Sequence, residues 1–548
     1  MAAMGDTPTT NFTPEPTPGE TLEDMHRLEA QRRRNRDAVA DLGLNPYGFS
    51  HRGLVSCAEA RRMYDEGADE EHKAHGKEEG FVDRRPVAAV AGRVMLLRDN
   101  GKLVWLQLRD ETCLGGDGAG SGDFQIAVSK RDCDEAGFAL AKVADLGDIV
   151  IAEGPITKTR TGEVTVWASK LRPGAKSLAA PPEKWAGLQD VETRYRKRYI
   201  DLYANPEAMR TLRLRSLIVA KMRRFMRERG FLEVETPMLQ PQAGGAAARP
   251  FLTHMNALDI ELSMRIAPEL YLKRLLVGGM RKVFEVGRNF RNEGLSRRHN
   301  PEFTAMEAYE AFGDCETMLE LTESLLRELA HFVAVETAPD DVSIEDIDAA
   351  QVKLPFREWM VDYGSPFVRI TYGELFEKAL GFPMTDAVRA REEAKKRGLK
   401  HEGMADVFVI NELFEEAAEP TIDPARPTFV TKYPSAISPL TRPDPENPAL
   451  ADRWDLFIGE MEIGPAYTEL NDPDIQEAKF REQLAGADEE EQAFRSFDED
   501  FIEALKVGMP PAGGLGLGVD RIVMLLTDSD TIRDVIPFPF MRPVARDD

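Results

Sequence analysis

Residues 284–314 have the sequence FEVGRNFRNEGLSRRHNPEFTAMEAYEAFGD, and this stretch decides the fold of the C-terminal part of the chain. Its pattern predicts a strand over Val283–Phe290, a polar loop over Arg291–Glu302 and a returning strand over Phe303–Phe312. Side chains alternate between the two faces of a strand. One face of the returning strand therefore carries Phe303, Glu307 and Tyr309. A face that packs on a core rarely holds a Glu between aromatic rings, so we expect a binding surface.

The loop of this hairpin is rich in cations. It contains Arg291, Arg297, Arg298 and His299. The planar guanidinium group of arginine donates two parallel hydrogen bonds to a phosphate group. A loop of arginines beside an aromatic face therefore predicts a nucleotide clamp.

A second group of carboxylates lies in residues 454–471, WDLFIGEMEIGPAYTELN. A tight turn at Ile458-Gly459 is expected to place Asp455 opposite Glu462 in a hairpin. Two facing carboxylates repel unless a cation lies between them, and oxygen ligands suit Mg²⁺ or Mn²⁺. The alternative is a solvated acidic edge. Farther along the same strand, Tyr467 and Glu469 share one face.

The third motif is GGLGLGVDRIVMLL, residues 513–526. We expect the glycines to let backbone approach a ligand and a helix to begin near Val519, with Arg521 in its first turn. Pro510-Pro511 precedes the glycines where a dinucleotide-binding motif needs a strand, which argues against that fold. A cation at the positive end of a helix is unfavourable unless an anion binds there.

The rest of residues 205–548 mixes strands and helices without a regular βαβ alternation, which favours an α+β domain with an antiparallel sheet. Upstream, five β-rich runs are predicted: Val87–Leu97, Leu103–Leu108, Phe124–Val128, Ile149–Ile156 and Glu163–Leu171. Five short strands suit a small closed barrel, and the OB fold is one candidate. The glycine-rich stretch Gly115–Gly122 predicts a mobile loop between two of them.

The chain of 548 residues is long enough for several domains. We expect a disordered Pro/Thr-rich tail (1–20), a helical N-terminal arm (21–82), the barrel (83–175), a linker (176–204) and the α+β domain (205–548). The arm begins with a helix from Thr21 to about Ala40. Arg32, Arg33, Arg34 and Arg36 on this helix either face solvent or contact RNA.

The composition excludes several classes of protein. No run of eighteen apolar residues exists, so no membrane partner is expected. The four cysteines are scattered and no secretory signal precedes them, which fits a cytoplasmic protein. The net charge is −25, yet Val191–Gly230 holds twelve cations and four anions. Any contact with nucleic acid must therefore be local.

Taken together, the motifs resemble the three signatures of class II aminoacyl-tRNA synthetases: GFLEVETP (230–237), the Arg291 hairpin and GLGLGVDR (514–521). PQAGGAAARPF (241–251), RIAPELYLKRLLVGG (265–279), MEIGPAYTELNDP (461–473) and TIRDVIPFPFMRP (531–543) are similar to the lysyl-tRNA synthetase family. The resemblance runs from about Arg85 to Pro543. It implies an OB-fold anticodon-binding domain, a catalytic domain on a six-stranded antiparallel sheet, and a homodimer.

The resemblance also implies substrates and site residues. The expected substrates are L-lysine, ATP and tRNA(Lys), with Mg²⁺ as cofactor. Arg291 and Arg521 would be catalytic, and the implied ATP-binding set is Arg291, Glu293, His299, Asn300, Phe303 and Arg521. The magnesium positions match Asp455 and Glu462. The lysine pocket matches Gly245, Glu269, Glu307, Tyr309, Tyr467 and Glu469, and the anticodon-reading positions match Arg93, Trp105, Gln125 and Glu163.

The pocket chemistry agrees with this resemblance. A selective site for lysine must line its apolar stem with rings and replace the water around its ammonium group with carboxylates. An aspartyl or asparaginyl enzyme would instead need a cation or an amide donor in that place. Trp105 is expected to stack on an unpaired base, although it could also fill the barrel core.

The family pattern is broken at Pro465, where the family usually has Asn. Proline lacks both the amide side chain and a backbone N–H, so a contact to the carboxylate or α-amine of lysine is expected to be either missing or supplied by another group. Two further readings remain besides an aspartyl or asparaginyl enzyme. One is a paralogue that attaches lysine to a protein, although such paralogues lack the OB domain. The other is a catalytically silent RNA-binding protein.

Overall fold

The computed structural model describes residues 22–114, 122–182, 188–246, 248–339, 342–486 and 498–543. The expected tail (1–20) and most of the glycine-rich stretch Gly115–Gly122 lie outside these residues. The chain divides into two compact units, one formed by Met1–Arg210 and the other by Thr211–Ala338 and Val342–Asp548. Each unit is described by itself. Among the described residues, no helix combines the length and the apolar character that crossing a membrane requires.

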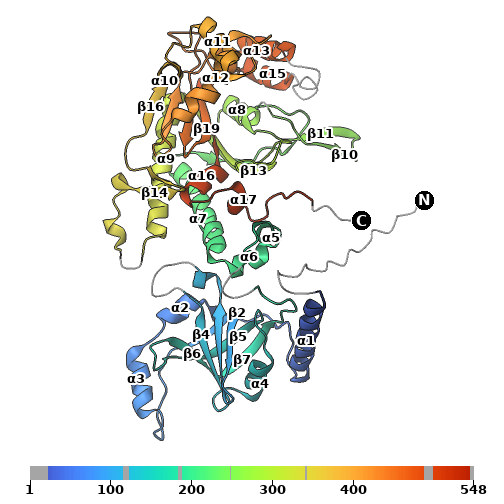
Figure 1. The fold of residues 1–548 in the computed structure, drawn as a ribbon, viewed down its shortest axis with the longest axis vertical. Coiled ribbons are helices and arrows are strands. Elements are labelled where there is room, and N and C mark those ends of the chain that lie inside the picture. Colours follow the sequence, from blue (N-terminus) through green and yellow to red (C-terminus); the bar gives the residue numbers. More distant parts are fainter. Residues whose placement is uncertain are drawn as a thin grey trace, which may run out of the picture. The chain divides into compact units, whose positions relative to one another are not determined.

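The first unit contains a closed five-stranded barrel, as expected for an OB fold (Figure 1). Its strands are β2 (Val87–Asp99), β3 (Leu103–Arg109), β4 (Phe124–Ser129), β5 (Ile149–Lys158) and β6 (Val164–Ala168). Pairing of β2 with β5 closes the ring. The predicted fifth run is two strands, since a break at Ser169 separates β6 from β7 (Lys170–Ala175), which continues along β5. Val104, Leu106, Phe124 and Ile126 point into the barrel core.

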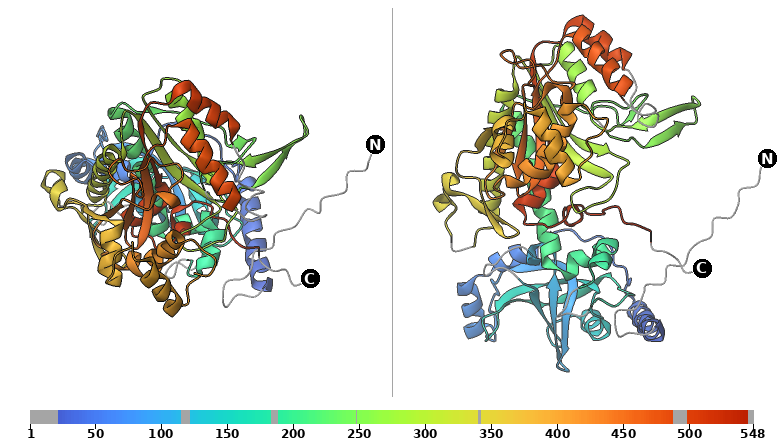
Figure 2. Two further views of the ribbon diagram at one scale, coloured as in Figure 1. Left: turned by 90° about the horizontal axis from the view of Figure 1, so that it is seen from above. Right: turned by 45° about the horizontal axis from the view of Figure 1, so that its top comes forward.

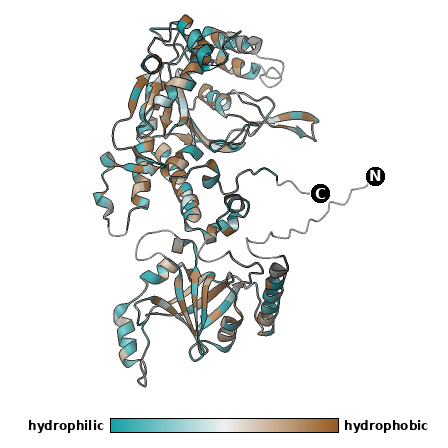
Figure 3. Cartoon of the chain, in the orientation of Figure 1, coloured by the Kyte–Doolittle hydropathy of each residue, from teal (hydrophilic) through white to brown (hydrophobic). Residues whose placement is uncertain are grey.

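Short elements surround this barrel. They are α1 (Leu22–Asp41), β1 (Leu54–Val55), α2 (Cys57–Arg62), α3 (Glu66–His75), η1 (Glu111–Leu114), α4 (Glu135–Val143), α5 (Val191–Arg196) and α6 (Arg198–Ala204). In Figure 3, α3 is mostly hydrophilic whereas the barrel strands carry hydrophobic stretches. Helix α1 confirms the predicted N-terminal helix. Its Arg32 is nearly buried and donates to the carbonyl oxygens of Leu146 and Ser177, so this arginine anchors the helix on its own unit.

The second unit is built on an eight-stranded sheet in the order β16-β17-β18-β19-β20-β13-β12-β8. The six central strands are antiparallel, as the resemblance implied, and one parallel strand is added at each edge. The strands are β8 (Leu232–Glu233), β12 (Lys282–Phe290), β13 (Glu302–Ala311), β16 (Val368–Thr371), β17 (Thr428–Thr431), β18 (Arg453–Ile458), β19 (Met461–Thr468) and β20 (Ala512–Gly518).

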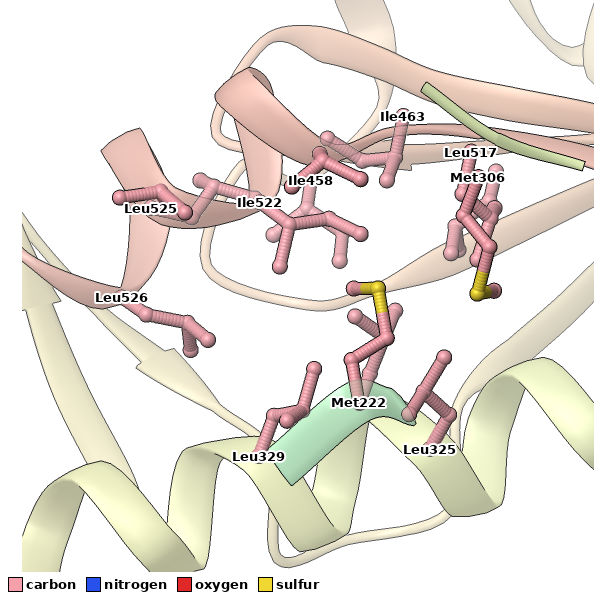
Figure 4. Close-up of a cluster of buried hydrophobic side chains, with 14 of the residues drawn as sticks. Met222, Met306, Leu325, Leu329, Ile458, Ile463, Leu517, Ile522, Leu525 and Leu526 are labelled. Atoms are coloured by element: carbon pink, nitrogen blue, oxygen red, sulfur yellow. The ribbon is translucent and has the colours of Figure 1, made fainter. Parts of the chain in front are cut away.

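Three helices pack on one face of this sheet: α7 (Pro206–Glu228), α9 (Cys315–Glu336) and α16 (Val519–Leu526). Figure 4 shows Met222 of α7 and Leu325 of α9 near Met306 of β13 and Ile522 of α16. Met306 lies on the opposite face of β13 from Phe303, Glu307 and Tyr309. Hydrophobic packing on the even-numbered side of β13 therefore holds its odd-numbered side chains on the other face of the sheet.

The remaining elements lie around this sheet. They are β9 (Leu239–Gln240), β10 (Leu252–Met255), β11 (Ile260–Met264), α8 (Glu269–Val277), η2 (Ile344–Asp346), η3 (Ala349–Gln351), β14 (Lys353–Phe356), β15 (Trp359–Asp362), α10 (Tyr372–Leu380), α11 (Ala387–Arg397), α12 (Asp406–Leu413), η4 (Phe414–Ala418), η5 (Glu419–Thr421), η6 (Ser435–Ile437), α13 (Pro473–Gly486), α15 (Glu499–Gly508) and α17 (Ile532–Val535). The β10–β11 hairpin projects away from the sheet in all three views (Figures 1 and 2).

The glycine run at 513–518 forms most of β20, a central strand of the sheet. The lack of side chains is what allows this. A Cβ atom on Gly514 would collide with Glu469 and would lie 2.5 Å from the ring of Tyr309. The glycines therefore leave space beside β20 for side chains of the neighbouring strands.

Candidate active site and nucleic-acid-binding face

A cavity of about 350 Å³ opens in the second unit, between β13, β19, β20 and the loop after β12. Most of the predicted catalytic and pocket residues line it: Gly245, Glu269, Arg291, Glu293, His299, Asn300, Phe303, Glu307, Tyr309, Glu462, Tyr467 and Arg521. Asp455 and Glu469 are not in its wall. The two strands of the Arg291 hairpin and the helix start at Arg521 thus meet at one cavity although they are far apart in sequence.

Guanidinium groups face one part of this cavity. The guanidinium carbon of Arg291 lies 5.1 Å from the centre of the Phe303 ring, and the buried Nε of Arg291 has no hydrogen-bond partner. Arg521 donates to the carbonyl oxygen of Glu462 (2.5 Å), and its Nη2 lies 3.0 Å from Nε2 of His299. Burial and the nearby charge of Arg521 lower the pKa of His299, so this ring is neutral and accepts from Arg521. These cations can receive an anion such as a phosphate group.

Carboxylate and phenol groups face another part of the cavity. The hydroxyl group of Tyr309 donates to Glu307 (3.3 Å). Burial and the neighbouring carboxylate of Glu269 raise the pKa of Glu307 to about 8. Tyr467 also lines this part, and burial raises its pKa strongly. A cation that enters here would relieve the repulsion between the carboxylates.

Lys273 is a feature of this region that sequence reasoning missed. Its ammonium group is fully buried and pairs with Glu269 (2.6 Å) and Glu469 (2.5 Å). Burial alone would lower the pKa of Lys273, but the two carboxylates raise it, so this lysine stays charged. Burial still raises the pKa of Glu469 to about 8, with a further contribution from Glu269. The signal was present in the sequence, because Glu269 and Lys273 lie four residues apart on one helix.

The predicted pairing of Asp455 with Glu462 is wrong. The turn of the β18–β19 hairpin consists of Gly459 and Glu460, both with positive φ, and not of Ile458-Gly459. This turn places Ile458 opposite Met461, and a β-bulge after Leu456 shifts the register further. As a result, Asp455 faces Pro465, and Arg453 pairs with its carboxylate (2.7 Å).

Asp455 and Glu462 are nevertheless close enough to interact. Loss of solvent and the charge of Asp455 raise the pKa of Glu462. A third carboxylate, Glu419, has its pKa raised to about 7 by burial and then by Glu462. Glu419 was not predicted, and no spacing in the sequence connects it with the β18–β19 hairpin. The oxygen donors and their mutual repulsion fit a hard divalent cation.

In the first unit, three of the four predicted anticodon-reading residues lie on the outer face of β3, β4 and the turn before β6. Trp105 is half-buried and points away from the barrel core, so it does not fill that core. Gln125 accepts a hydrogen bond from Thr165 (2.8 Å), and Glu163 is exposed. The fourth residue, Arg93, donates to the carbonyl oxygen of Gly147 (2.7 Å) and covers the ring of Tyr203.

Arg98 is a cation of this face that sequence reasoning missed. It is exposed, and the register of β2 and β3 places it directly opposite Trp105, whereas Arg93 lies opposite Arg109. The sequence spacing could not identify Arg98 as the residue opposite Trp105, because the register of β2 and β3 shifts between Val94 and Leu96. An exposed guanidinium group beside an indole ring suits a nucleotide phosphate next to a stacked base.

Comparison with known proteins gives a family match for each of the two domains. Residues 190–542 match the family model "tRNA synthetases class II (D, K and N)", and residues 88–173 match "OB-fold nucleic acid binding domain". The chain is 42% identical to a lysine--tRNA ligase of Carboxydothermus hydrogenoformans and 43% identical to one of Staphylococcus aureus; each alignment covers 95% of this chain and 99% of the relative. A lysine--tRNA ligase of Cronobacter sakazakii is 46% identical over 83% of this chain and 86% of its own length.

The folds, the two matched family models and the near-complete coverage of these relatives all agree. The chain belongs to the lysine--tRNA ligase family of class II aminoacyl-tRNA synthetases.

Proposed function

We propose that this protein joins L-lysine to the 3′ end of tRNA(Lys) at the expense of ATP. The observation that carries the proposal is the single cavity whose wall holds guanidinium groups in one part and carboxylates with phenols in another. A triphosphate and a primary amine are the two chemical groups that such a wall can receive together. The family membership supports the same reaction.

The reaction has two steps. The carboxylate of lysine attacks the α-phosphorus of ATP, pyrophosphate leaves, and lysyl-adenylate forms. A ribose hydroxyl group of the terminal adenosine of the tRNA then attacks the acyl carbon and releases AMP. Neither step needs a side-chain nucleophile, so catalysis consists of positioning the reactants and stabilising the developing phosphoryl charge.

We assign the nucleotide to the arginine-lined part of the cavity. Arg291 and Arg521 are the catalytic residues and contact the phosphate groups, and Phe303 stacks on adenine. Glu293, His299 and Asn300 complete the ATP site. Glu462 and Asp455 would hold Mg²⁺, which neutralises phosphate charge when it is bound. The ion pair with Arg453 would hold the Asp455 carboxylate in place and leave lone pairs for a metal ion.

We assign lysine to the acidic part of the cavity, next to Gly245, Glu269, Glu307, Tyr309 and Tyr467. Glu469 acts from behind the wall through Lys273 unless binding turns its side chain inward. For the tRNA anticodon, we assign Trp105, Gln125 and Glu163, and we add Arg98 on the grounds of register. Arg93 precedes Arg98 on β2 and lies opposite Arg109, so we assign it a position at the border of this face.

We further propose a homodimer formed around the exposed apolar residues of β8 to β11 and their connections. These are Leu232, Leu239, Leu252, Met255, Leu258 and Ile260. A projecting hairpin with so many exposed apolar side chains suits a self-complementary interface. Sedimentation equilibrium should give twice the chain mass of 61.3 kDa.

We also propose a cytoplasmic location and the domain division 1–20, 21–82, 83–175, 176–204 and 205–548.

Pyrophosphate exchange measured with each of the twenty amino acids tests the proposed reaction. Lysine alone should support exchange. Exchange with aspartate or asparagine would indicate the other members of the class, and no exchange at all would indicate a silent RNA-binding protein. Charging of tRNA(Lys) compared with modification of added protein separates the enzyme from a lysine-transferring paralogue.

A further inference from the structure

Two tryptophans, and not one, form the aromatic surface on the outer face of the barrel. Trp105 of β3 lies opposite Ala127 of β4, and Ala127 in turn lies opposite Trp167 of β6. The centres of the two rings are 6.2 Å apart and their planes are perpendicular. The small side chain of Ala127 leaves space for the rings to meet across the middle strand.

The position of Trp167 is not explained by the barrel core. Its neighbours Val166 and Ala168 are buried in that core, whereas Trp167 points to the other side of β6 and is half-buried. Its indole N–H donates to Asp132 (2.9 Å), which fixes the plane of the ring. A large ring held rigidly at a partly exposed position is well suited to stacking, because little conformational entropy is lost on binding.

Cations lie at the same end of these strands. Arg98 faces Trp105 across β2 and β3, and the turn after β4 carries the exposed Lys130 and Arg131, of which Arg131 pairs with Asp132 (2.8 Å). The backbone N–H of Lys130 donates to the carbonyl oxygen of the exposed Lys102. Aromatic rings with surrounding cations are the combination that binds single-stranded nucleic acid through its bases and its phosphates.

We propose that Trp167 is a second base-stacking residue, so that Trp105 and Trp167 together hold two unpaired nucleotides of the tRNA. The proposal rests on the proposed function and extends it by one nucleotide and one binding residue. The perpendicular rings present differently oriented surfaces, which requires a turn of the RNA backbone between the two bases. Such a turn is accessible in an anticodon loop because its bases are unstacked on binding.

Anisotropy of a fluorescently labelled tRNA(Lys) transcript, titrated with the full-length protein at fixed salt, tests this proposal. Trp167→Ala should raise the Kd by roughly tenfold, since stacking on an aromatic side chain contributes that much per base. Trp167→Phe keeps the ring but loses the N–H that reaches Asp132, and it should bind within about threefold of the original protein. Equal losses in both variants would mean that Trp167 only braces the barrel through Asp132, and would overturn the proposal. So would an unchanged Kd in Trp167→Ala.

A set of anticodon stem-loops, each with one abasic nucleotide, identifies the base involved. One abasic position should weaken binding to the original protein but not to Trp167→Ala, and a different position should behave in this way for Trp105→Ala. If no position loses its effect in Trp167→Ala, the second stacking site does not exist. Lysine-dependent pyrophosphate exchange should be unchanged in Trp167→Ala. If the original protein lacks that exchange, the proposed function fails independently of this test.

Discussion

The cavity of the second unit and the outer face of the barrel are both polar, but they hold charge in different ways. In the cavity region, carboxylates are buried and internal cations balance part of their charge, as Lys273 does for Glu269 and Glu469. On the barrel, Arg98 and Lys130 are exposed and water screens them, and Arg131 pairs with Asp132 at the surface. The same residue types therefore have strong interactions in one region and weak ones in the other. The difference teaches that burial, more than residue type, determines how strongly a charged group interacts with its neighbours.

The largest effect is expected for Arg291, whose buried Nε has no hydrogen-bond partner in the cavity. Arg291→Ala should reduce lysine-dependent pyrophosphate exchange by about 10²–10³-fold, because one preorganised charge facing the reacting phosphate is lost. The circular dichroism spectrum should not change. Arg281→Ala, at an exposed position, is the matched control. An exchange rate for Arg291→Ala equal to that of the control contradicts the assignment.

A large effect on stability is expected for the internal counter-ion. Lys273→Met leaves two buried carboxylates without their cation and should lower the free energy of unfolding by about 3–5 kcal/mol in urea titrations. The double variant Lys273→Met/Glu469→Gln removes one of those charges and should recover part of the loss. If the single variant is as stable as the original protein, the ion pairs of Lys273 with Glu269 and Glu469 do not stabilise the fold. Burial would then not make these charges more important than the exposed charges of the barrel.

The next largest effect is expected from the titration of Glu307. It should change the KM for lysine by up to roughly tenfold between about pH 7 and about pH 9. Its pKa of about 8 means that the carboxyl group is largely protonated at neutral pH and ionises as the pH rises. Ionised Glu307 attracts the substrate ammonium, so the KM for lysine should fall over this range. Without lysine, the stability that the raised pKa provides is present at low pH and is lost as the pH rises through about 8. Glu307→Gln should flatten both profiles, measured by steady-state kinetics and by thermal unfolding.

A smaller change is expected at Pro465, which lines the cavity and faces Asp455. Pro465→Asn restores an amide side chain and should lower the KM for lysine by about fivefold, the contribution of one hydrogen bond. Pro465→Ala separates the gain of the amide from the loss of the ring. Identical KM values in all three proteins would show that position 465 does not contact the substrate.

The smallest effect is expected on the exposed face of the barrel. Arg98→Ala should weaken binding of tRNA(Lys) only about twofold to threefold, because solvent screens this charge, and should reduce the slope of log Kd against log salt by about one. Arg52→Ala, also exposed in the first unit, is the control. A loss of tRNA affinity as large as the loss of exchange rate in Arg291→Ala would mean that this face is desolvated in the complex.

The sequence predicted the parts of this molecule whose geometry is local. The alternation along residues 303–309 was sufficient to place Phe303, Glu307 and Tyr309 on one face, because the period of a strand does not depend on its partners. Register was not predictable in this way. Positive φ at Glu460, which is uncommon for a residue other than glycine, and a bulge near Leu456 moved Asp455 to another partner. A bulge in β2 likewise concealed the pairing of Arg98 with Trp105.

Contacts between distant segments were also beyond sequence reasoning. Glu419 approaches Glu462 from a separate helical segment, and nothing in either sequence indicates the other. The glycine run forms a strand although local preferences disfavour glycine there, because the large side chains of the neighbouring strands need the space beside it.

The glycine strand has a consequence for inhibitors directed at this cavity. Gly516 and Gly518 of β20 contribute peptide groups to its wall. A mutation to a residue other than proline keeps the peptide group and can only add bulk, and bulk here would also obstruct the natural substrates. Compounds that hydrogen-bond to this strand should therefore select for drug resistance less readily than compounds that depend on the side chains opposite it.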